Sequence, residues 1–380
     1  MWDYVSLEQL LAAPIRNGLT KPSRIRGTGV KMISMGEIFS YDRIGDLPME
    51  RVPVTEGELE SSNIESGDLL FARQSLVLEG AGKCSIVTDV NEPTVFESHL
   101  IRVRIDKEKA LPHFIYYYFK SNEGRGRIRG IVEQVAAAGI RGKDLIKLLV
   151  PCPPLDVQEA IVANLQQLDE LALINRRAND YLLQLCATRY DEARREIAVN
   201  DDASEQAVLT DLIEVCYGKD HKKLADGEYP VYGSGGLMRH VENYLHEGES
   251  VLIPRKGTLN NVMVVHGRFW TVDTMFYTKE LFAGAARYAY FILAKLDLAS
   301  MNAGSAVPSM TTKMLSAIPV LQPSPTKLAE LESWSDPLFE QIRLNERENE
   351  RLETLRDTLL PKLMSSEIDV SATSSEQLVV

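Results

Sequence analysis

The sequence predicts an α/β protein in which two globular domains of mixed α/β structure are joined by two long antiparallel coiled-coil helices with pseudo-two-fold symmetry. The first observation is a heptad series with one polar member, which recurs 170 positions later in the chain. Such a series is typical of paired helices, and an asparagine at one core position fixes their register at some cost in stability. The predicted helix-pair core is Ile161, Leu168, Asn175 and Leu182 in one helix and Leu331, Leu338, Asn345 and Leu352 in the other.

The second observation is that a single order of elements occurs twice. Short strands and turns come first, followed by an aromatic helix, a proline-rich stretch and a long helix. Because a duplicated chain tends to fold with pseudo-two-fold symmetry, we expect the long helices to pair with each other, with one globular domain at each end. The alternative is that each helix packs only on the surface of its own domain.

The first domain is predicted to cover residues 1–154. A turn at 66–68 precedes an apolar strand at 69–72, and further strands are expected at 85–87 and 100–105. Residues 111–120 are rich in aromatic side chains and predict a buried or amphipathic helix. The prolines in 151–154 end the domain, since proline favours extended connections.

The first long helix is predicted over 155–200, with Asp156 as its cap, and the second domain over 201–325. This domain repeats the plan of the first: a turn at 247–250 before a strand at 251–253, then a strand at 262–265 and an aromatic helix at 288–293. The second long helix is predicted over 326–366, and the polar residues 367–380 as a flexible tail. Forty helical residues would extend over roughly 60 Å.

Composition restricts the class of protein. The net charge is −12, and residues 326–380 alone hold 12 acidic and 6 basic side chains, so the negative charge gathers in the helical segments and the tail. A DNA-binding role would therefore need partners that neutralise much of the phosphate charge. The four scattered cysteines predict neither a disulfide nor a zinc site, and fit a reduced cytoplasm. We expect no signal peptide and no membrane partner.

The strongest local motifs lie in the second domain. They are the stretches Tyr232–Gly236 (Tyr-Gly-Ser-Gly-Gly), Ile253–Thr258 (Ile-Pro-Arg-Lys-Gly-Thr), Phe269–Thr274 and Gly304–Ser309. Together and in this order they resemble the target-recognition domain of type I restriction-modification specificity subunits. The resemblance extends over about residues 1–365. The first domain is less similar, because Ala72–Ser75 (Ala-Arg-Gln-Ser) stands where an Arg-Lys-Gly turn is expected, and 322–325 lacks the usual Pro-Leu-x-x-Gln form.

The resemblance implies a non-catalytic specificity subunit in a bacterial defence system. Each target-recognition domain would read one half of a bipartite double-stranded DNA target, and the helices would set the spacer between the halves. It also implies that two modification subunits dock along the helices and that ATP-driven restriction subunits can join them. S-adenosylmethionine and ATP are expected only in those partners, so we expect this chain to hold no cofactor and no metal.

Most of the residues expected to contact DNA are cations. Arg255 and Lys256 are the leading pair, because Gly257 lets the backbone approach a phosphate closely. The basic run at 124–129 is suited to phosphates, and the equally weighted alternative is an ordinary exposed loop or helix end. Lys143, Ser309 and Lys313 could touch DNA or cap the next helix. The full set is Arg73, Gln74, Lys83, Arg125, Arg127, Lys143, Tyr232, Ser234, Arg255, Lys256, Thr258, Ser309 and Lys313.

Catalytic motifs are missing from the sequence. The stretch 80–83 resembles a phosphate-binding loop but has Val77 in place of its first glycine, and the six histidines lack metal-ligand spacing. No Asn-Pro-Pro-Tyr or Asp-Pro-Pro-Tyr methyltransferase motif occurs. Two other interpretations remain open: a stand-alone DNA methyltransferase or nuclease, and a coiled-coil scaffold whose globular ends bind proteins.

Overall fold

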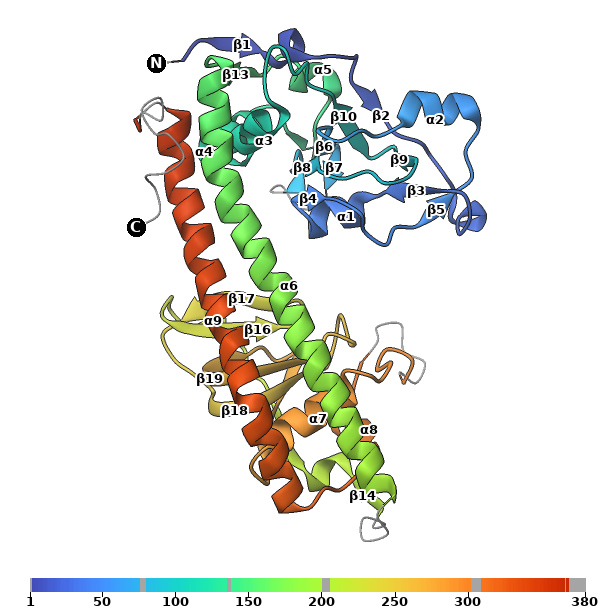
Figure 1. Ribbon diagram of the computed structural model, residues 1–380, viewed down its shortest axis with the longest axis vertical. Coiled ribbons are helices and arrows are strands. Elements are labelled where there is room, and N and C mark those ends of the chain that lie inside the picture. The colour runs from blue at the N-terminus through green and yellow to red at the C-terminus, as the bar shows by residue number, and fades with distance from the viewer. Residues whose placement is uncertain are drawn as a thin grey trace. The chain divides into compact units, whose positions relative to one another are not determined.

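The computed structural model describes residues 2–75, 80–134, 138–199, 206–301, 309–365 and 367–368 (Figure 1). The chain divides into two compact units. The first unit contains the residues up to Ile174 together with those from Glu348 onward, and the second unit is Asn175–Arg347. The two long helices, α6 (Leu155–Val199) and α9 (Pro325–Met364), each contribute one half to each unit.

The first unit is built on a five-stranded sheet with the order β2-β10-β6-β8-β4. Smaller sheets, β5-β3-β9, β11-β12-β7 and β1-β13, adjoin it. The strands are β1 (Tyr4–Ser6), β2 (Arg16–Asn17), β3 (Val30–Ile33), β4 (Arg43–Ile44), β5 (Arg51–Val52), β6 (Leu69–Ala72), β7 (Gln74–Ser75), β8 (Cys84–Val87), β9 (Thr94–Phe96), β10 (Leu100–Val103), β11 (Glu133–Gln134), β12 (Ala138–Gly139) and β13 (Leu149–Pro151). The helices are α1 (Met35–Ser40), α2 (Glu56–Ser62), α3 (Pro112–Lys120), α4 (Asn122–Arg129) and α5 (Gly142–Leu145).

The second unit has a six-stranded sheet with the order β15-β20-β18-β19-β16-β17, and a small sheet of β14 and β21. The helix α7 packs against β18, β19 and β20. Its elements are β14 (Gln206–Val208), β15 (Ile213–Tyr217), β16 (Tyr229–Gly233), β17 (Gly236–Val241), β18 (His246–Pro254), β19 (Met263–Thr271), β20 (Met275–Glu280), α7 (Ala285–Leu293), α8 (Thr312–Leu315) and β21 (Pro319–Leu321).

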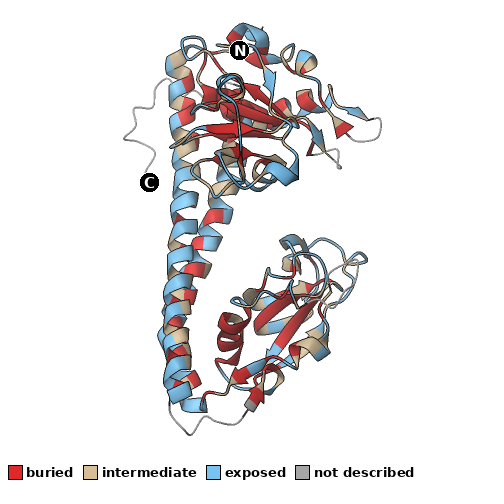
Figure 2. Cartoon of the chain, turned by 90° about the vertical axis from the view of Figure 1, so that its right-hand side faces the viewer, coloured by how far each residue is buried: buried red, intermediate tan, exposed pale blue. Residues whose placement is uncertain are grey.

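The aromatic helices α3 and α7 belong to the buried cores of their units, and Figure 2 marks the buried residues of the chain in red. Most of their side chains are buried, because both helices are apolar around nearly their whole circumference. The buried phenols still find partners. The Tyr118 hydroxyl donates to the Leu149 carbonyl at 3.2 Å, and the Tyr288 hydroxyl donates to the Leu321 carbonyl at 2.9 Å. Both acceptors lie in the strand that leads to a long helix, so each aromatic helix fixes the entry to α6 or α9.

The two long helices run antiparallel within each unit. In the first unit, Ile161 and Leu165 of α6 share a buried cluster with Leu360 and Leu363 of α9, and Arg356 pairs with Asp169 at 3.0 Å. In the second unit, the Tyr190 hydroxyl lies 3.1 Å from that of Ser335, and the Lys327 amine lies 2.8 Å from the Glu196 carboxylate. The partner's residue number falls along α9 as the residue number rises along α6, as it does in the first unit. These contacts confirm the predicted antiparallel coiled coil.

The predicted heptad series lies on the packed face of each helix. Ile161, Leu331, Asn175 and Asn345 are buried, whereas Leu168, Leu182, Leu338 and Leu352 are half-buried. Sequence reasoning missed two further asparagines, Asn179 and Asn349, which are also buried. The Asn345 amide donates to the Asn179 side-chain oxygen at 2.7 Å, so a polar layer interrupts the apolar seam of the second unit.

Two sequence-based expectations about local structure were wrong. Residues 247–250 belong to β18 instead of forming a turn, because β18 pairs with β19 from His246 onward, and Gly248 and Gly267 face each other with positive φ values of 130° and 97°. The basic run at 124–129 is neither a loop nor only a helix end, since it makes up most of α4. Gly124 permits this helix, because a β-carbon there would lie 2.1 Å from the Tyr118 carbonyl oxygen.

Several expectations fall outside the described residues: Val77, the segment Gly304–Pro308, the linker at 200–205 and most of the tail from 367 onward. Among the helices that are described, none is both long and apolar enough to cross a membrane.

Candidate nucleic-acid interface

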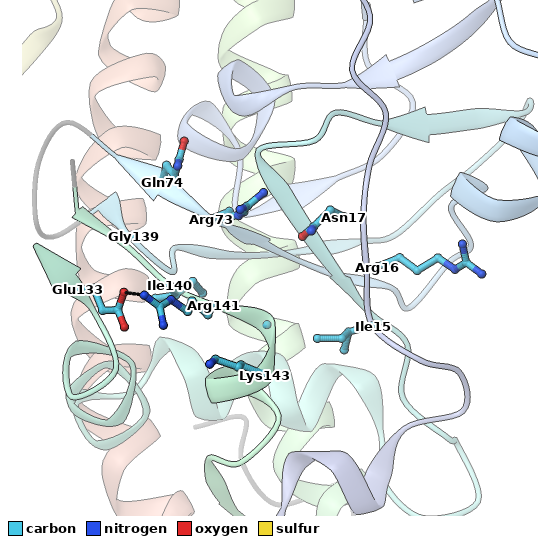
Figure 3. A pocket seen from close by; sticks show the side chains of 11 residues that line it. Ile15, Arg16, Asn17, Arg73, Gln74, Glu133, Gly139, Ile140, Arg141 and Lys143 are labelled. Atoms are coloured by element: carbon cyan, nitrogen blue, oxygen red, sulfur yellow. Dashed lines mark ion pairs between the residues drawn. The ribbon is translucent and has the colours of Figure 1, made fainter. Parts of the chain in front are cut away.

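A polar cavity of about 600 Å³ opens on the first unit, and three of the predicted DNA-contacting residues line it (Figure 3). The walls come from β2, from the residues after β6, from β11 and β12, and from the start of α5. The lining residues are Ile15, Arg16, Asn17, Arg73, Gln74, Glu133, Gly139, Ile140, Arg141, Gly142 and Lys143.

Backbone hydrogen bonds hold Arg73 and Gln74 at this cavity. The Arg73 N–H donates to the His99 carbonyl at 2.8 Å, and the Arg73 carbonyl accepts from the Ile140 N–H at 2.9 Å. Gln74 lies in β7 and pairs with Gly139 of β12. Because the main chain is fixed on both sides, the two side chains project from a rigid base and remain available for a ligand.

The cavity carries an excess of positive charge. Arg141 pairs with Glu133 at 2.5 Å, whereas Arg16, Arg73 and Lys143 have no side-chain hydrogen bond or ion pair within the described parts of the chain. Arginine can bind a phosphate or the edge of a guanine with two parallel hydrogen bonds, and a glutamine amide can do the same with adenine. The arrangement can therefore bind a polyanion and also read hydrogen-bonding edges of bases.

The second unit positions Arg255 in the same way. Its N–H donates to the Thr274 carbonyl at 2.8 Å, and its carbonyl accepts from the Met310 N–H at 2.9 Å. Lys256 forms a β-bridge with Ser309, as Gln74 does with Gly139. Lys313 on α8 corresponds to Lys143 on α5, 170 positions earlier. Two copies of one cation-bearing backbone clamp thus occur in the chain.

A pair of glycines marks the same point in both units. A β-carbon on Gly18 would lie 2.0 Å from the Phe96 carbonyl oxygen, and one on Gly218 would lie 2.0 Å from that of Val272. The residue before Gly218 is Tyr217, and the Arg255 guanidinium lies 5.3 Å from the centre of its ring. Arg255 also donates to the Asp273 carbonyl at 3.4 Å. Tyr217 therefore occupies in the second unit the place that Asn17 has in the first.

Ser234 and Ser309 lie against the segment that follows Arg255, through Gly257 and Lys256 respectively. The Ser234 carbonyl accepts from the Asn261 side-chain amide at 2.9 Å, which ties the β16–β17 hairpin to the loop that contains the exposed Thr258. Tyr232 is half-buried, with its ring 6.3 Å from that of Phe269, so it contributes to the packing of the sheet.

Lys83, Arg125 and Arg127 lie outside the cavity and bind groups of their own unit. The Lys83 amine donates to the Phe39 carbonyl at 2.9 Å and lies 3.5 Å from Asp42. Arg125 donates to the Gly82 carbonyl at 3.0 Å, and burial lowers the pKa of its guanidinium. Arg127 pairs with Glu123 at 2.9 Å. The structure thus separates these three cations from Arg73, Gln74 and Lys143.

Sequence reasoning did not identify Arg16, Asn17 and Arg141, although all three line the cavity. Arg141 is next but one to Lys143, so its position could have been noticed. Arg16 and Asn17 form a strand of two residues, which has no periodicity that a sequence could reveal.

Comparison with known proteins assigns the family. A family model described as "Type I restriction modification DNA specificity domain" matches residues 1–183 and 204–354. The chain belongs to this family. The match includes both units and confirms the resemblance drawn from the motifs of the second domain.

Curated relatives and a solved structure agree with this assignment. The chain is 28% identical over 174 residues to the EcoKI specificity subunit of Escherichia coli K12, a match that covers 45% of this chain and 37% of that relative. It is 18% identical to the MjaIX specificity subunit of Methanocaldococcus jannaschii, over 97% of this chain and 94% of the relative. The crystal structure of the type I restriction-modification S subunit from M. genitalium covers 96% of both chains with a TM-score of 0.50 at 17% identity, which supports the fold alone.

The extent of these matches differs. The EcoKI, MjaVIII and StySPI specificity subunits are matched over only 37%, 42% and 40% of their own length.

Proposed function

We propose that this protein is the DNA-specificity subunit of a type I restriction-modification complex, in which each unit reads one half of a bipartite double-stranded DNA target. The observation that carries the proposal is the duplicated clamp, in which Arg73 and Arg255 are held by equivalent backbone hydrogen bonds. Two equivalent cationic sites in one chain suit a target made of two separate half-sites, as in other DNA-binding proteins with two reading modules.

In this proposal α6 and α9 set the distance between the half-sites. Forty helical residues extend over roughly 60 Å, which corresponds to about 17 base pairs at about 3.4 Å per step. That length is enough for two short recognition elements and an unread spacer.

We propose further that partner subunits carry out the chemistry. Two modification subunits would dock along the long helices and methylate adenine with S-adenosylmethionine, and restriction subunits would use ATP for translocation and cleavage. The net charge of −12 supports this division, because basic partners would supply the phosphate neutralisation that the chain lacks. The assembly would act in the cytoplasm, where the DNA is accessible.

An exchange of one unit tests the proposal. Replacing residues 205–325 by those of a relative with a different target should change one half of the methylated sequence and leave the other half as it was, with genomic adenine methylation as the readout. A change in both halves would contradict the assignment of one reader to each unit.

The competing interpretations predict other results. Methyl transfer or cleavage by the purified chain alone, incubated with DNA and labelled methyl donor or magnesium, would identify a stand-alone enzyme. An assembled complex that protects no DNA would favour a protein-binding scaffold.

A further inference from the structure

The tip of the β16–β17 hairpin exposes two consecutive apolar side chains. Leu237 is 50% exposed and Met238 is 57% exposed. They lie on β17, the edge strand of the six-stranded sheet, directly after the glycine-rich turn. Single apolar residues on a surface are common, so the exposure alone assigns no role to them. The residues around them indicate a role.

The hairpin tip and the cationic loop of the second unit form one continuous surface. A β-carbon on Gly257 would lie 2.5 Å from the Ser234 hydroxyl, so the turn packs directly against the residues that follow Arg255 and Lys256. Asn261 completes the contact through its hydrogen bond to the Ser234 carbonyl. Lys256 has no side-chain partner in the described part of this unit, and its ammonium group remains available to a phosphate.

Leu237 and Met238 are consecutive in β17, so their side chains point to opposite faces of the hairpin. Leu237 pairs with Tyr232 across the hairpin, and Gly236 has a φ of 110° that a side chain would disfavour. The Met238 sulfur lies 2.6 Å from the point where a β-carbon on Gly233 would be, so it occupies the space that this glycine leaves open. β16 also pairs with β19 through Val231 and Tyr232, so the part of the hairpin that can enter the major groove of B-DNA, which is about 12 Å wide, is its tip beyond these residues.

We propose that Leu237 and Met238 contact thymine 5-methyl groups in the major groove of the half-target that the second unit reads. The 5-methyl of thymine is the apolar group among the base edges of that groove, and apolar side chains recognise it by contact. The neighbouring cations bind the phosphates and position the hairpin, while each apolar side chain contacts a methyl group on its own face of the hairpin. This inference rests on the proposed function and adds the chemical group that is recognised.

The test uses the assembled complex of this chain with its modification subunits, and target DNA in which each thymine of the half-site is replaced in turn by deoxyuridine. Uracil differs from thymine only in lacking the 5-methyl group. Removing one buried methyl group should weaken binding by about fourfold at one or two positions. Leu237→Ala or Met238→Ala should weaken binding to the thymine target by a similar factor and abolish the difference between thymine and uracil at the one position that the removed side chain contacts.

A matched control is available in the same unit. Leu281 is 51% exposed and directly follows β20. It lies at the end of β20 opposite to Met275, which pairs with Pro254, the residue before Arg255. Leu281→Ala should keep the full dependence on the methyl group. Since all three leucine or methionine side chains are at least half exposed, the variants should keep the melting temperature of the parent.

The outcomes separate this inference from the proposed function. Specific binding that ignores every thymine-to-uracil replacement, or a half-target that contains no thymine, would overturn the methyl contact and leave the specificity subunit intact. Variants that weaken binding to thymine and uracil targets alike would also overturn it, and would instead indicate a wedge between base steps. A complex with no sequence-specific binding at all would refute the proposed function itself.

Discussion

At the residue scale, the cations of this chain divide into those that bind their own unit and those that do not. Lys83, Arg125 and Arg127 each have a partner within the first unit, whereas Arg73 and Lys143 have none among the described residues. The backbone, rather than a side-chain contact, positions Arg73. A cation placed in this way costs the fold little when it is removed, and it is free to act on a ligand.

Replacement of Arg73 by alanine tests this division. We expect Arg73→Ala to weaken DNA binding by the assembled complex by about 1–3 kcal/mol with little change in thermal stability. Arg127→Ala should weaken binding less and should lower the melting temperature, because Arg127 pairs with Glu123 and lies over the Tyr4 ring at 5.1 Å. Equal losses of affinity for the two variants, measured by DNA titration at one salt concentration, would contradict the division.

At the scale of secondary-structure elements, the long helices were the most predictable part of the molecule. Their heptad repeat placed them at 155–200 and 326–366, and the structure has them at Leu155–Val199 and Pro325–Met364. A period repeated over many turns leaves little freedom for another structure. Short strands were less predictable, since β18 begins five residues before the predicted strand and its Gly248 resembles a turn residue.

The candidate site was predictable only in part for a related reason. Arg73 and Gln74 could be recognised because they follow a predicted strand, where the second domain has Arg255 and Lys256. Lys143 could be recognised because it follows Gly142 ahead of a proline-rich stretch. The cavity itself forms where β2, β7, β12 and α5 converge, and these elements have two to four residues each. Their convergence depends on tertiary pairing, such as that of Gln74 with Gly139, which no local pattern encodes.

The polar layer of the helix pair makes a distinct prediction. Asn345 donates to Asn179 at 2.7 Å and accepts from the Gln341 amide at 2.8 Å. Asn345→Leu alone should destabilise the pair by about 1–3 kcal/mol, because the buried Asn179 oxygen loses its donor. The double replacement Asn179→Leu and Asn345→Leu should instead stabilise the pair and loosen its register.

Urea unfolding of the three proteins gives the stability comparison, and cross-linking between cysteines introduced on facing turns of α6 and α9 reports the register. A double variant that is less stable than the single variant would show that the polar layer contributes to the stability of the helix pair and not only to its register.

At the scale of the whole molecule, the length of the helices becomes the variable. Inserting seven residues into both α6 and α9 adds roughly 10 Å to each helix, equivalent to about three base pairs. We expect the spacer of the methylated target to lengthen accordingly while both half-sequences stay the same.

An insertion of five residues is the matched control, because it rotates the packed face away from its partner and should abolish assembly instead of lengthening the spacer. A seven-residue insertion that leaves the target gap unaltered would show that the helices do not measure it.

The division of each long helix between two units has a consequence for synthesis. The second unit is one continuous segment, Asn175–Arg347, but the first unit is completed only by residues from Glu348 onward. Until Leu360 and Leu363 leave the ribosome, Ile161 and Leu165 lack the neighbours that bury them. The first unit therefore begins to be synthesised before the second but is completed after it. A chain truncated by a premature stop would expose the apolar face of α6 to proteases and chaperones. Fragments that lack the residues from Glu348 onward, and so could read only part of the DNA target, would thereby be removed.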